Sequence, residues 1–351
     1  MYISASAKLL SAAAALALLA GCSSGSAIIP TSSTIQSHNF PAMSGRVPTI
    51  VNPFLMLKLR EVGTANQKAS FNACPATGPI VYVSDVNYNV IYIFKVPFAG
   101  QSPCGLIAAS SGLVNPQGLI VRHHDLFVAN TGAMNVVAFH RGATKPYITY
   151  TDPTCGFQYP LDVTVSNDNY VFATNIYGGG CQGSISIWQK QSGALVGHIR
   201  NQARAYSQFL TIQKDGTLYY DDTSPGLYRG SCAGGACGSF SKVGASFVYP
   251  GGLRSADGED VVLDDEFAPG GGALLTYEPP NFSSPDVCTL GGSDPVSFDI
   301  NHRQHRAFIA DAGLNEALEF SYPDCKLIGT VRGNSYGAPI GIAKDFPETL
   351  H

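Results

Sequence analysis

Six carboxylate or amide side chains recur along the chain, each at the end of a short hydrophobic run. They are Asp85, Asn130, Asn175, Asp222, Asp265 and Asp311, at intervals of 45, 45, 47, 43 and 46 residues. Such oxygens can bind a hard cation such as calcium. They can also accept hydrogen bonds from the backbone of a following turn. Every repeat needs its turn, whereas a metal site needs only a few irregular ligands. We therefore predict turn caps at a ring of loops, with a calcium site as the alternative.

Two histidine pairs are the next candidates for chemistry, His123 with His124 and His302 with His305. Both pairs fall where a hairpin turn is expected between two hydrophobic runs, and polar turns are ordinary there. The Gly-x-Ser-x-Gly pattern occurs at 21–25, in the signal region, and at 333–337, before a strand pattern rather than a helix. No nucleophile elbow is therefore expected, and no cysteine is expected to be free to act with a histidine. The glycine-rich stretches 177–183 and 269–275 precede strand patterns rather than helices, unlike phosphate-binding loops. We identify no catalytic residue and assign no metal or other cofactor.

The composition argues against a nucleic-acid-binding protein and for a chain of many short strands. The chain has 351 residues, of which 45% are hydrophobic and only 13% charged, and its net charge is −4. No basic run offers an electrostatic surface for nucleic acid, so a nucleic-acid partner is not expected. The 38 glycines and 22 prolines fit a chain of many short strands and turns.

The first residues have the pattern of a targeting signal. Lys8 precedes an apolar stretch from Leu9 to Ala20, which suits a signal peptide but is too short for a membrane-spanning helix. The sequence Leu-Ala-Gly-Cys at 19–22 resembles the bacterial lipobox. That resemblance implies a lipoprotein signal peptide at residues 1–21 and acyl chains on Cys22, and two or more chains anchor stably. An ordinary secretory signal is the alternative. Ser23 implies, by the same resemblance, the outer membrane where a cell has two.

Eight cysteines remain after Cys22, and an even number in an exported chain indicates disulfides, formally with 105 pairings. Cysteines that are neighbours in sequence are also neighbours within one repeat. We therefore predict the pairs Cys74–Cys104, Cys155–Cys181, Cys232–Cys237 and Cys288–Cys325. A zinc site is the rival interpretation, but no Cys-x-x-Cys or Cys/His spacing of the zinc kind occurs.

The elements that position these residues repeat with a period typical of a four-stranded propeller blade. The capped run, such as Val-Tyr-Val-Ser-Asp at 81–85, is followed by a second strand and a more polar third strand. A further strand then follows, usually after a proline, as at 115–121. The first capped run has no such strand before it, and the strand at 339–344 has no capped run after it. We therefore predict an all-β, six-bladed propeller in which the C-terminal strand completes the first blade, leaving no open edge.

The predicted boundaries follow from this count. Residues 1–21 form the signal peptide, 22–46 a disordered tether that is rich in Ser, Thr, Pro and Ala, and 47–74 an N-terminal extension. Residues 75–346 form the propeller.

The motif Pro-x-Gly-hydrophobic, followed by Val-x-Asp and a strand after Asn, resembles the NHL-repeat propellers and their gluconolactonase-like relatives. The resemblance covers about 75–345, with departures at Ser207-Gln208, where Pro-x is expected, and at Pro295-Val296-Ser297, which lacks the glycine. It implies the architecture but not one activity. In lactonase-like relatives a divalent cation, commonly calcium, lies at the central channel.

We therefore expect a binding module of the bacterial cell envelope, anchored to the membrane through its lipid and acting outside the cytoplasm. Its loop face would bind an unknown protein or small molecule. A metal-dependent, lactonase-like hydrolase and a structural envelope protein are the alternatives. Catalysis is the less favoured class because the sequence offers no catalytic constellation.

Overall fold

The computed structural model describes residues 69–71, 73–155, 158–177, 181, 183–200, 207–222, 226–256, 259–291, 294–332 and 338–346. The chain divides into two units, Met1–Arg46 and Val47–His351, and every described residue belongs to the second. The predicted signal peptide, the tether and most of the extension therefore lie outside the described residues, as does Cys22. Among the described residues no helix is long and apolar enough to cross a membrane.

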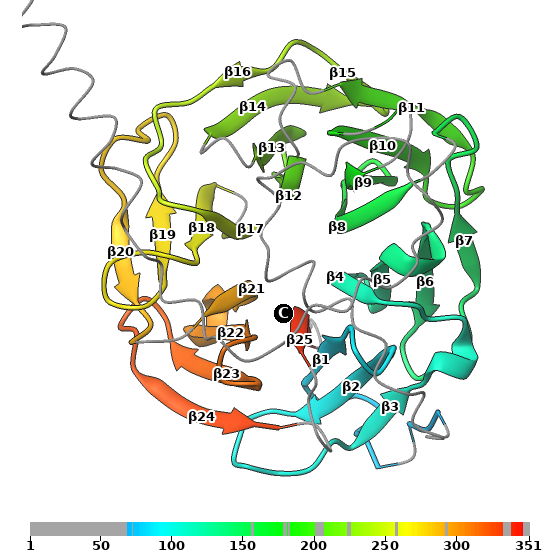
Figure 1. Ribbon diagram of the computed structural model, residues 1–351, viewed down its shortest axis with the longest axis vertical. Coiled ribbons are helices and arrows are strands. Elements are labelled where there is room, and N and C mark those ends of the chain that lie inside the picture. The colour runs from blue at the N-terminus through cyan, green and yellow to red at the C-terminus, as the bar shows by residue number, and fades with distance from the viewer. Residues whose placement is uncertain are drawn as a thin grey trace, which may run out of the picture. The chain divides into compact units, whose positions relative to one another are not determined.

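The second unit is a ring of six small antiparallel sheets, which confirms the predicted six-bladed all-β propeller (Figure 1). From the centre outward, the first three blades are β25 (Pro339–Asp345), β1 (Ile80–Asp85), β2 (Val90–Lys95) and β3 (Gly105–Ile107); β4 (Pro116–Arg122), β5 (Asp125–Asn130), β6 (Asn135–His140) and β7 (Ile148–Tyr150); and β8 (Tyr159–Val165), β9 (Tyr170–Tyr177), β10 (Ser184–Gln189) and β11 (Leu195–Arg200).

The other three blades follow the same order from the centre outward. They are β12 (Ser207–Ile212), β13 (Thr217–Asp222) and β14 (Gly226–Ala233), with β15 (Ala236–Cys237) and β16 (Ser241–Lys242) both on β14; β17 (Pro250–Ala256), β18 (Asp260–Asp265), β19 (Ala273–Tyr277) and β20 (Asp286–Thr289); and β21 (Pro295–Asn301), β22 (Arg306–Asp311), β23 (Glu316–Ser321) and β24 (Leu327–Val331). Three short 3-10 helices are described, η1 (Ala109–Ser111), η2 (Thr131–Ala133) and η4 (His302–Gln304).

The C-terminal strand closes the ring, as predicted. Strand β25 pairs antiparallel with β1, with Ile80 opposite Asp345 and Val81 opposite Lys344. The innermost strands β25, β4, β8, β12, β17 and β21 then contact one another in succession around the centre. Closure covers the inner edge of β1, but the outermost strand of each blade still ends its sheet, so the prediction that no open edge remains is wrong there.

The Pro-x-Gly segments have a common structural cause. Each innermost strand changes register against its neighbour in this segment, as a β-bulge does, and this holds even at Ser207 and Pro295, where the motif departs. The bulges bring the backbones of neighbouring blades close together. A Cβ added at Gly341 would lie 1.9 Å from the carbonyl oxygen of Gln117, so only glycine fits there.

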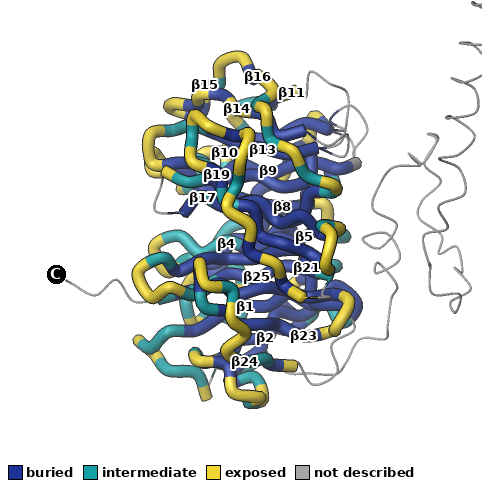
Figure 2. Tube along the Cα trace, turned by 90° about the vertical axis from the view of Figure 1, so that its left-hand side faces the viewer, coloured by how far each residue is buried: buried dark blue, intermediate teal, exposed yellow. Residues whose placement is uncertain are grey.

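Large apolar side chains fill the space between neighbouring blades, and exposed residues are concentrated in loops and on the outer strands (Figure 2). Trp188, the one tryptophan of the chain, is completely buried between the second and third blades together with Phe127 and Tyr150. Its indole N–H donates to the carbonyl oxygen of Thr151 at 2.9 Å. Burial of such a side chain stabilises the fold by about 1.5–3 kcal/mol or more.

Four disulfides cross-link the described chain, and they are the pairs predicted from the sequence. They join Cys74 to Cys104, Cys155 to Cys181, Cys232 to Cys237, and Cys288 to Cys325. The described end of the N-terminal extension is fixed to the first blade, because Ser70 also pairs with Leu106 in an isolated β-bridge. Such cross-links stabilise mainly by restricting the unfolded chain.

Candidate functional site

The strand-end residue of the fifth blade caps the loop that leads into its own innermost strand. The two carboxylate oxygens of Asp265 accept hydrogen bonds from the N–H groups of Val248 and Tyr249, both at 2.9 Å. In the second blade the Asn130 side-chain oxygen accepts from the N–H of Val114 at 2.7 Å. These bonds satisfy loop donors that would otherwise be buried without a partner.

Asp85 and Asp311 do the same and also hold the turn that follows them. Asp85 accepts from the N–H groups of Asn87 and Tyr88 at 3.0 and 3.2 Å, and more weakly from the N–H of Ala338 before β25. Asp311 accepts from the N–H groups of Leu314 and Asp294 at 2.8 and 3.2 Å. Four of the six strand-end residues therefore make the hydrogen bonds of turn caps.

Asn175 and Asp222 differ from the other four. The Asn175 amide donates to the hydroxyls of Ser186 and Ser184 at 2.8 and 3.3 Å, on the next strand of its blade. Asp222 is hydrogen-bonded to Tyr228, also on the next strand. In the third and fourth blades the strand-end residue therefore binds side chains of the adjacent strand instead of backbone N–H groups of a loop.

The strand-end carboxylates do not come together as a metal site. In the described part of the chain, one group of three or more His, Cys, Asp or Glu side chains is close enough to share an ion, and it contains none of them. Each cap already uses at least one oxygen to accept backbone N–H groups of its loops. The calcium site considered from the sequence is therefore not favoured at these residues.

A buried ion pair fills the centre of the ring. Arg254 on β17 donates to the Asp162 carboxylate on β8 at 3.0 Å and to the carbonyl oxygen of Leu119 on β4, also at 3.0 Å. Strands β17 and β4 stand opposite each other in the ring, so the side chain crosses it. Burial opposes the charged guanidinium, but Asp162 and Asp299 outweigh it and raise the pKa of Arg254. The Arg254 side chain therefore spans the centre of the ring at the level of Asp162 and Leu119.

Hydroxyl groups join neighbouring blades near this centre. Ser84, one residue before a cap, donates to the carbonyl oxygen of Gln117 in the next blade at 2.8 Å and accepts from the N–H of Gly341 at 2.8 Å. Thr174 occupies the same position in the third blade and donates to the carbonyl oxygen of Gln208 at 2.6 Å. Each hydroxyl is a donor and an acceptor at once, which this position requires.

Two aspartates take the place of these hydroxyls. Asp221 accepts from the N–H of Phe209 at 3.0 Å, and its second oxygen has no hydrogen-bond partner. Neither oxygen of Asp264 has one among the described residues. Burial raises the pKa of both carboxyls well above the usual value, and at Asp264 the nearby Glu266 adds to the effect. A protonated carboxyl, like a hydroxyl, could donate a hydrogen bond here.

The predicted hairpin histidines lie in turns. His123 and His124 connect β4 to β5, and both have positive φ angles of 50° and 62°, as a two-residue hairpin turn demands. His124 contacts the Asp345 carboxylate at 2.6 Å, and Arg141 contacts the same group at 2.5 Å. These contacts tie the second blade to the C-terminal strand, so His124 has a role in ring closure.

The second histidine pair lies in the corresponding hairpin of the sixth blade. His302 belongs to η4, and its ring meets that of Tyr322 edge-on at 5.3 Å between centroids. His305 ends the same turn with a φ of 52°. Neither pair joins a cluster of metal-binding side chains in the part of the chain that the structure describes.

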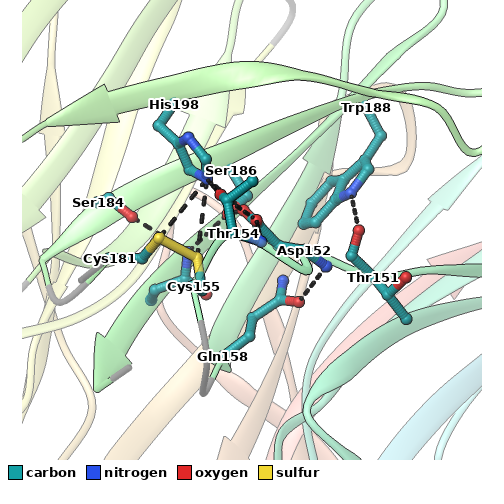
Figure 3. Close-up of a disulfide and its surroundings, with 11 residues drawn as sticks. Thr151, Asp152, Thr154, Cys155, Gln158, Cys181, Ser184, Ser186, Trp188 and His198 are labelled. Carbon is teal, nitrogen blue, oxygen red and sulfur yellow. Dashed lines mark hydrogen bonds and ion pairs between the residues drawn. A yellow bond between two sulfur atoms is a disulfide. The ribbon is translucent and has the colours of Figure 1, made fainter. Parts of the chain in front are cut away.

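A cluster that the sequence did not reveal lies at the outer part of the third blade (Figure 3). There Asp152, from the loop after β7, meets His198 on β11 beside the disulfide between Cys155 and Cys181. His198 Nε2 contacts a carboxylate oxygen of Asp152 and lies 3.7 and 3.6 Å from the two sulfur atoms. All four ligand atoms lie within 4.8 Å of one another.

Further hydrogen bonds fix the Asp152 carboxylate in this cluster. One oxygen accepts from the Thr154 hydroxyl at 2.7 Å, and the other accepts from the Ser186 hydroxyl at 2.8 Å. Although burial raises the pKa of Asp152, hydrogen bonds from Thr154, Ser186 and His198 outweigh it and hold that pKa below the usual value. The group is therefore an oriented anion next to an imidazole.

The sequence signal for this cluster was weak. Asp152 and Cys155 are close in the chain, but His198 is far along it and stands on an outer strand of a pattern shared with other blades. Sequence motifs for zinc sites have ligands separated by only a few residues. The ligands of this cluster are too far apart in the chain to form such a motif. Only the fold brings the four residues together.

Exposed large hydrophobic side chains mark one face of the ring. We call it the cap face, the face at which β1, β5, β9, β13, β18 and β22 end. On its loops lie Val114, Met134, Val248, Phe267 and Leu314, which are 37–52% exposed. The described loops that carry them, 108–115, 131–134, 243–249, 266–272 and 312–315, contain one charged residue, Glu266, and it is buried.

Comparison with known proteins relates the chain to others by fold. No family model and no curated protein matches it. A chain in the crystal structure of the nidogen/laminin complex aligns with a TM-score of 0.57 and 14% identity, covering 76% of this chain and 98% of that one. A protein of unknown function from Desulfotomaculum acetoxidans DSM 771 aligns with a TM-score of 0.56 and 12% identity, covering 78% of this chain and 100% of that one. These similarities support the propeller fold.

Proposed function

We propose that this protein is a binding platform of the bacterial cell envelope that is held at a membrane by lipid on Cys22 and binds a protein partner with its cap face. The observation that carries the proposal is the set of exposed hydrophobic side chains on nearly uncharged loops. Depletion of charge together with exposed apolar groups is typical of the central part of protein interfaces. Exposed patches of this kind often mark binding sites.

The distribution of these side chains favours a protein over a small molecule. Val114 and Met134 belong to the second blade, Val248 and Phe267 to the fifth, and Leu314 to the sixth. Since the second and fifth blades stand on opposite sides of the ring, one occupant that covers all of them must be broad. Specific protein interfaces bury about 800 Å² on each partner, and a surface of that size can reach across several blades.

The membrane anchor is proposed from the N-terminal sequence, which lies outside the described residues. The apolar run before Leu19-Ala20-Gly21-Cys22 and the lipobox resemblance support it. The four disulfides agree with a compartment outside the reducing cytoplasm. Kinship with NHL-repeat or gluconolactonase-like propellers remains a prediction from the repeat motif.

The structurally similar chain in the nidogen/laminin complex is part of a protein complex. This supports the proposal that a propeller of this kind can bind another protein. A lactonase-like hydrolase at the centre of the ring is less favoured. Arg254 and Asp162 fill that centre, and the strand-end carboxylates are bonded to their own loops or strands. A purely structural envelope protein would have no preferred partner on the cap face.

A photo-crosslinking amino acid placed at Phe267 or Leu314 tests the binding face in the full chain in its native envelope. The matched controls are Val287 and Leu327, which are 62% and 56% exposed but lie on the outer strands β20 and β24. We expect one defined protein adduct from the cap face and none from the outer strands. Equal labelling at all four positions, or none, would refute the proposed face.

The adduct's partner should then bind the purified chain, with an affinity that falls when Phe267 and Leu314 are both replaced by Ser. The corresponding pair Val287→Ser and Leu327→Ser should leave the affinity unchanged. Membrane attachment is tested separately by Cys22→Ala in the full chain, which should abolish incorporation of a labelled fatty acid. Incorporation that persists in Cys22→Ala would overturn the anchor without affecting the binding face.

A further inference from the structure

The cluster of Asp152, Cys155, Cys181 and His198 offers the donor set of a structural zinc site. Two thiolates, one imidazole nitrogen and one carboxylate oxygen are ligands that Zn²⁺ takes in a closed tetrahedral shell. In the structure the two sulfur atoms are joined as a disulfide. The geometry points to a redox-controlled zinc site, in which reduction of this disulfide creates the two thiolate ligands. This inference goes beyond the proposed binding function and does not depend on it.

The sulfur-to-nitrogen distances already fit a tetrahedron, whereas His198 Nε2 and the Asp152 oxygen, which are in direct contact, would have to separate to about 3.3 Å. With Zn–S and Zn–N bonds of about 2.3 and 2.0 Å, the sulfur-to-nitrogen edges of a tetrahedral site are about 3.5 Å long. His198 Nε2 lies 3.7 Å from Cys155 Sγ and 3.6 Å from Cys181 Sγ. Once the S–S bond is broken, the sulfurs need only move apart to about 3.8 Å, the corresponding sulfur-to-sulfur edge.

The carboxylate is already oriented as a ligand. Thr154 donates to one oxygen of Asp152 and Ser186 to the other, while Asn175 in turn donates to the Ser186 hydroxyl at 2.8 Å. Outer hydrogen bonds of this kind fix metal ligands and raise affinity. Figure 3 shows the His198 ring and the Asp152 carboxylate converging on the disulfide from different segments. The Asn175 side chain, singled out by the sequence repeat, therefore supports this cluster through Ser186.

The chemistry balances with a thiol reductant. Two external thiol groups transfer two electrons to the Cys155–Cys181 bond, which breaks to give two protein thiols, while the reductant becomes a disulfide. One Zn²⁺ then replaces the two thiol protons, which leave to solvent, while the imidazole proton of His198 shifts from Nε2 to Nδ1 so that Nε2 can bind the metal.

The surroundings distinguish this disulfide from the others. Among the described residues no other disulfide lies in a group of potential metal ligands. Cys288–Cys325 also joins separate strands or loops of the fold, with Cys288 buried, and so provides a matched control.

The test uses the full chain purified in detergent, reduced anaerobically with a phosphine, incubated with Zn²⁺ and freed of unbound metal. We expect one zinc per reduced chain by elemental analysis and none in the oxidised chain. Cobalt in place of zinc should give the visible absorption of a tetrahedral site with thiolate charge transfer. Cys155→Ser with Cys181→Ser should abolish both signals, whereas Cys288→Ser with Cys325→Ser should keep them.

His198→Gln and Asp152→Asn, folded with the disulfide intact and then reduced, should bind zinc at least roughly 10- to 100-fold more weakly, the loss that follows even from removal of outer partners. These variants keep the disulfide during folding. They therefore still test whether the cluster binds zinc if the variant with both cysteines replaced by Ser does not fold. The inference is overturned if the reduced wild-type chain unfolds or takes up no metal. It is equally overturned if the metal stays when Cys155 and Cys181 are both replaced.

Discussion

Replacement of Asp264 by Asn should make the propeller more stable at neutral pH. Asp264 is completely buried on β18, and neither of its oxygens has a hydrogen-bond partner among the described residues. Burial and the carboxylates of Glu266 and Asp265 raise its pKa well above the usual value. Asparagine has nearly the same shape, cannot ionise, and brings an amide N–H that can donate to a nearby carbonyl oxygen.

The sign of the pH dependence follows from the raised pKa. The native state binds the Asp264 proton more tightly than the unfolded state does, so this group contributes most to stability below the unfolded pKa of about 4. That contribution is lost as the pH rises through the native pKa. Near pH 4 the wild type and Asp264→Asn should therefore have similar free energies of unfolding. At pH 7–8 the variant should be more stable by about 1–3 kcal/mol, because the folded wild type must then either keep a proton, at a cost of about 1.4 kcal/mol for each pH unit above the unfolded pKa, or bury a charge.

Urea unfolding of the oxidised chain at several pH values measures this difference, with the buried Trp188 as the fluorescent reporter. Asp286→Asn, at an exposed position of β20, is the matched control and should change stability by less than about 0.5 kcal/mol. A variant that is less stable than the wild type at pH 7–8 would refute the reasoning. So would a difference between the two proteins that does not change with pH.

Three further changes test the ring and its caps by the same unfolding measurement. Arg254→Met should destabilise by about 3–5 kcal/mol, because it leaves the Asp162 carboxylate buried without its cation; a loss below about 1 kcal/mol would contradict the central ion pair. Gly341→Ala should cost about 1–3 kcal/mol or more, since its Cβ would overlap the next inner strand, whereas Gly197→Ala, with open space around it, should be nearly neutral. Asp265→Ala should cost about 1–2 kcal/mol through two lost backbone hydrogen bonds, and an unchanged stability would show that the loop needs no cap.

The repeat pattern was sufficient to predict the blades, the closure by β25 and the disulfide pairs. The blades and their closure depend on contacts within one blade or between its ends, and a period of about 45 residues fixes which segments meet. Cys288–Cys325 instead joins β20 of the fifth blade to the loop between β23 and β24 of the sixth, and it was predicted only as a pair of sequence neighbours. The bulges at Ser207 and Pro295 show that the backbone keeps this geometry even where the motif changes. Local pattern and global fold agree at these positions, which is why the prediction worked.

Contacts between blades could not be predicted in the same way. Arg254 and Leu119 are 135 positions apart in the chain and meet only because their strands face each other across the ring. Asp152 and His198 lie at ordinary positions of a loop and an outer strand, and no described outer strand of another blade carries a histidine. A repeat identifies what all blades share, whereas these sites depend on what one blade has alone.

The caps connect the fold to the proposed binding face. The Asp265 carboxylate holds the N–H groups of Val248 and Tyr249, and the Tyr249 ring lies 5.4 Å from the ring of Phe267 between centroids. Two exposed hydrophobic side chains, Val248 and Phe267, therefore lie on loops that are joined through one buried carboxylate and the Tyr249 ring. Since β25 covers the inner edge of β1, the remaining edges are the short outer strands, and Arg254 crosses the centre, loops held in this way are where one propeller can differ from another without loss of the fold. The residues that make the blades alike thus also fix the positions at which they can bind different partners.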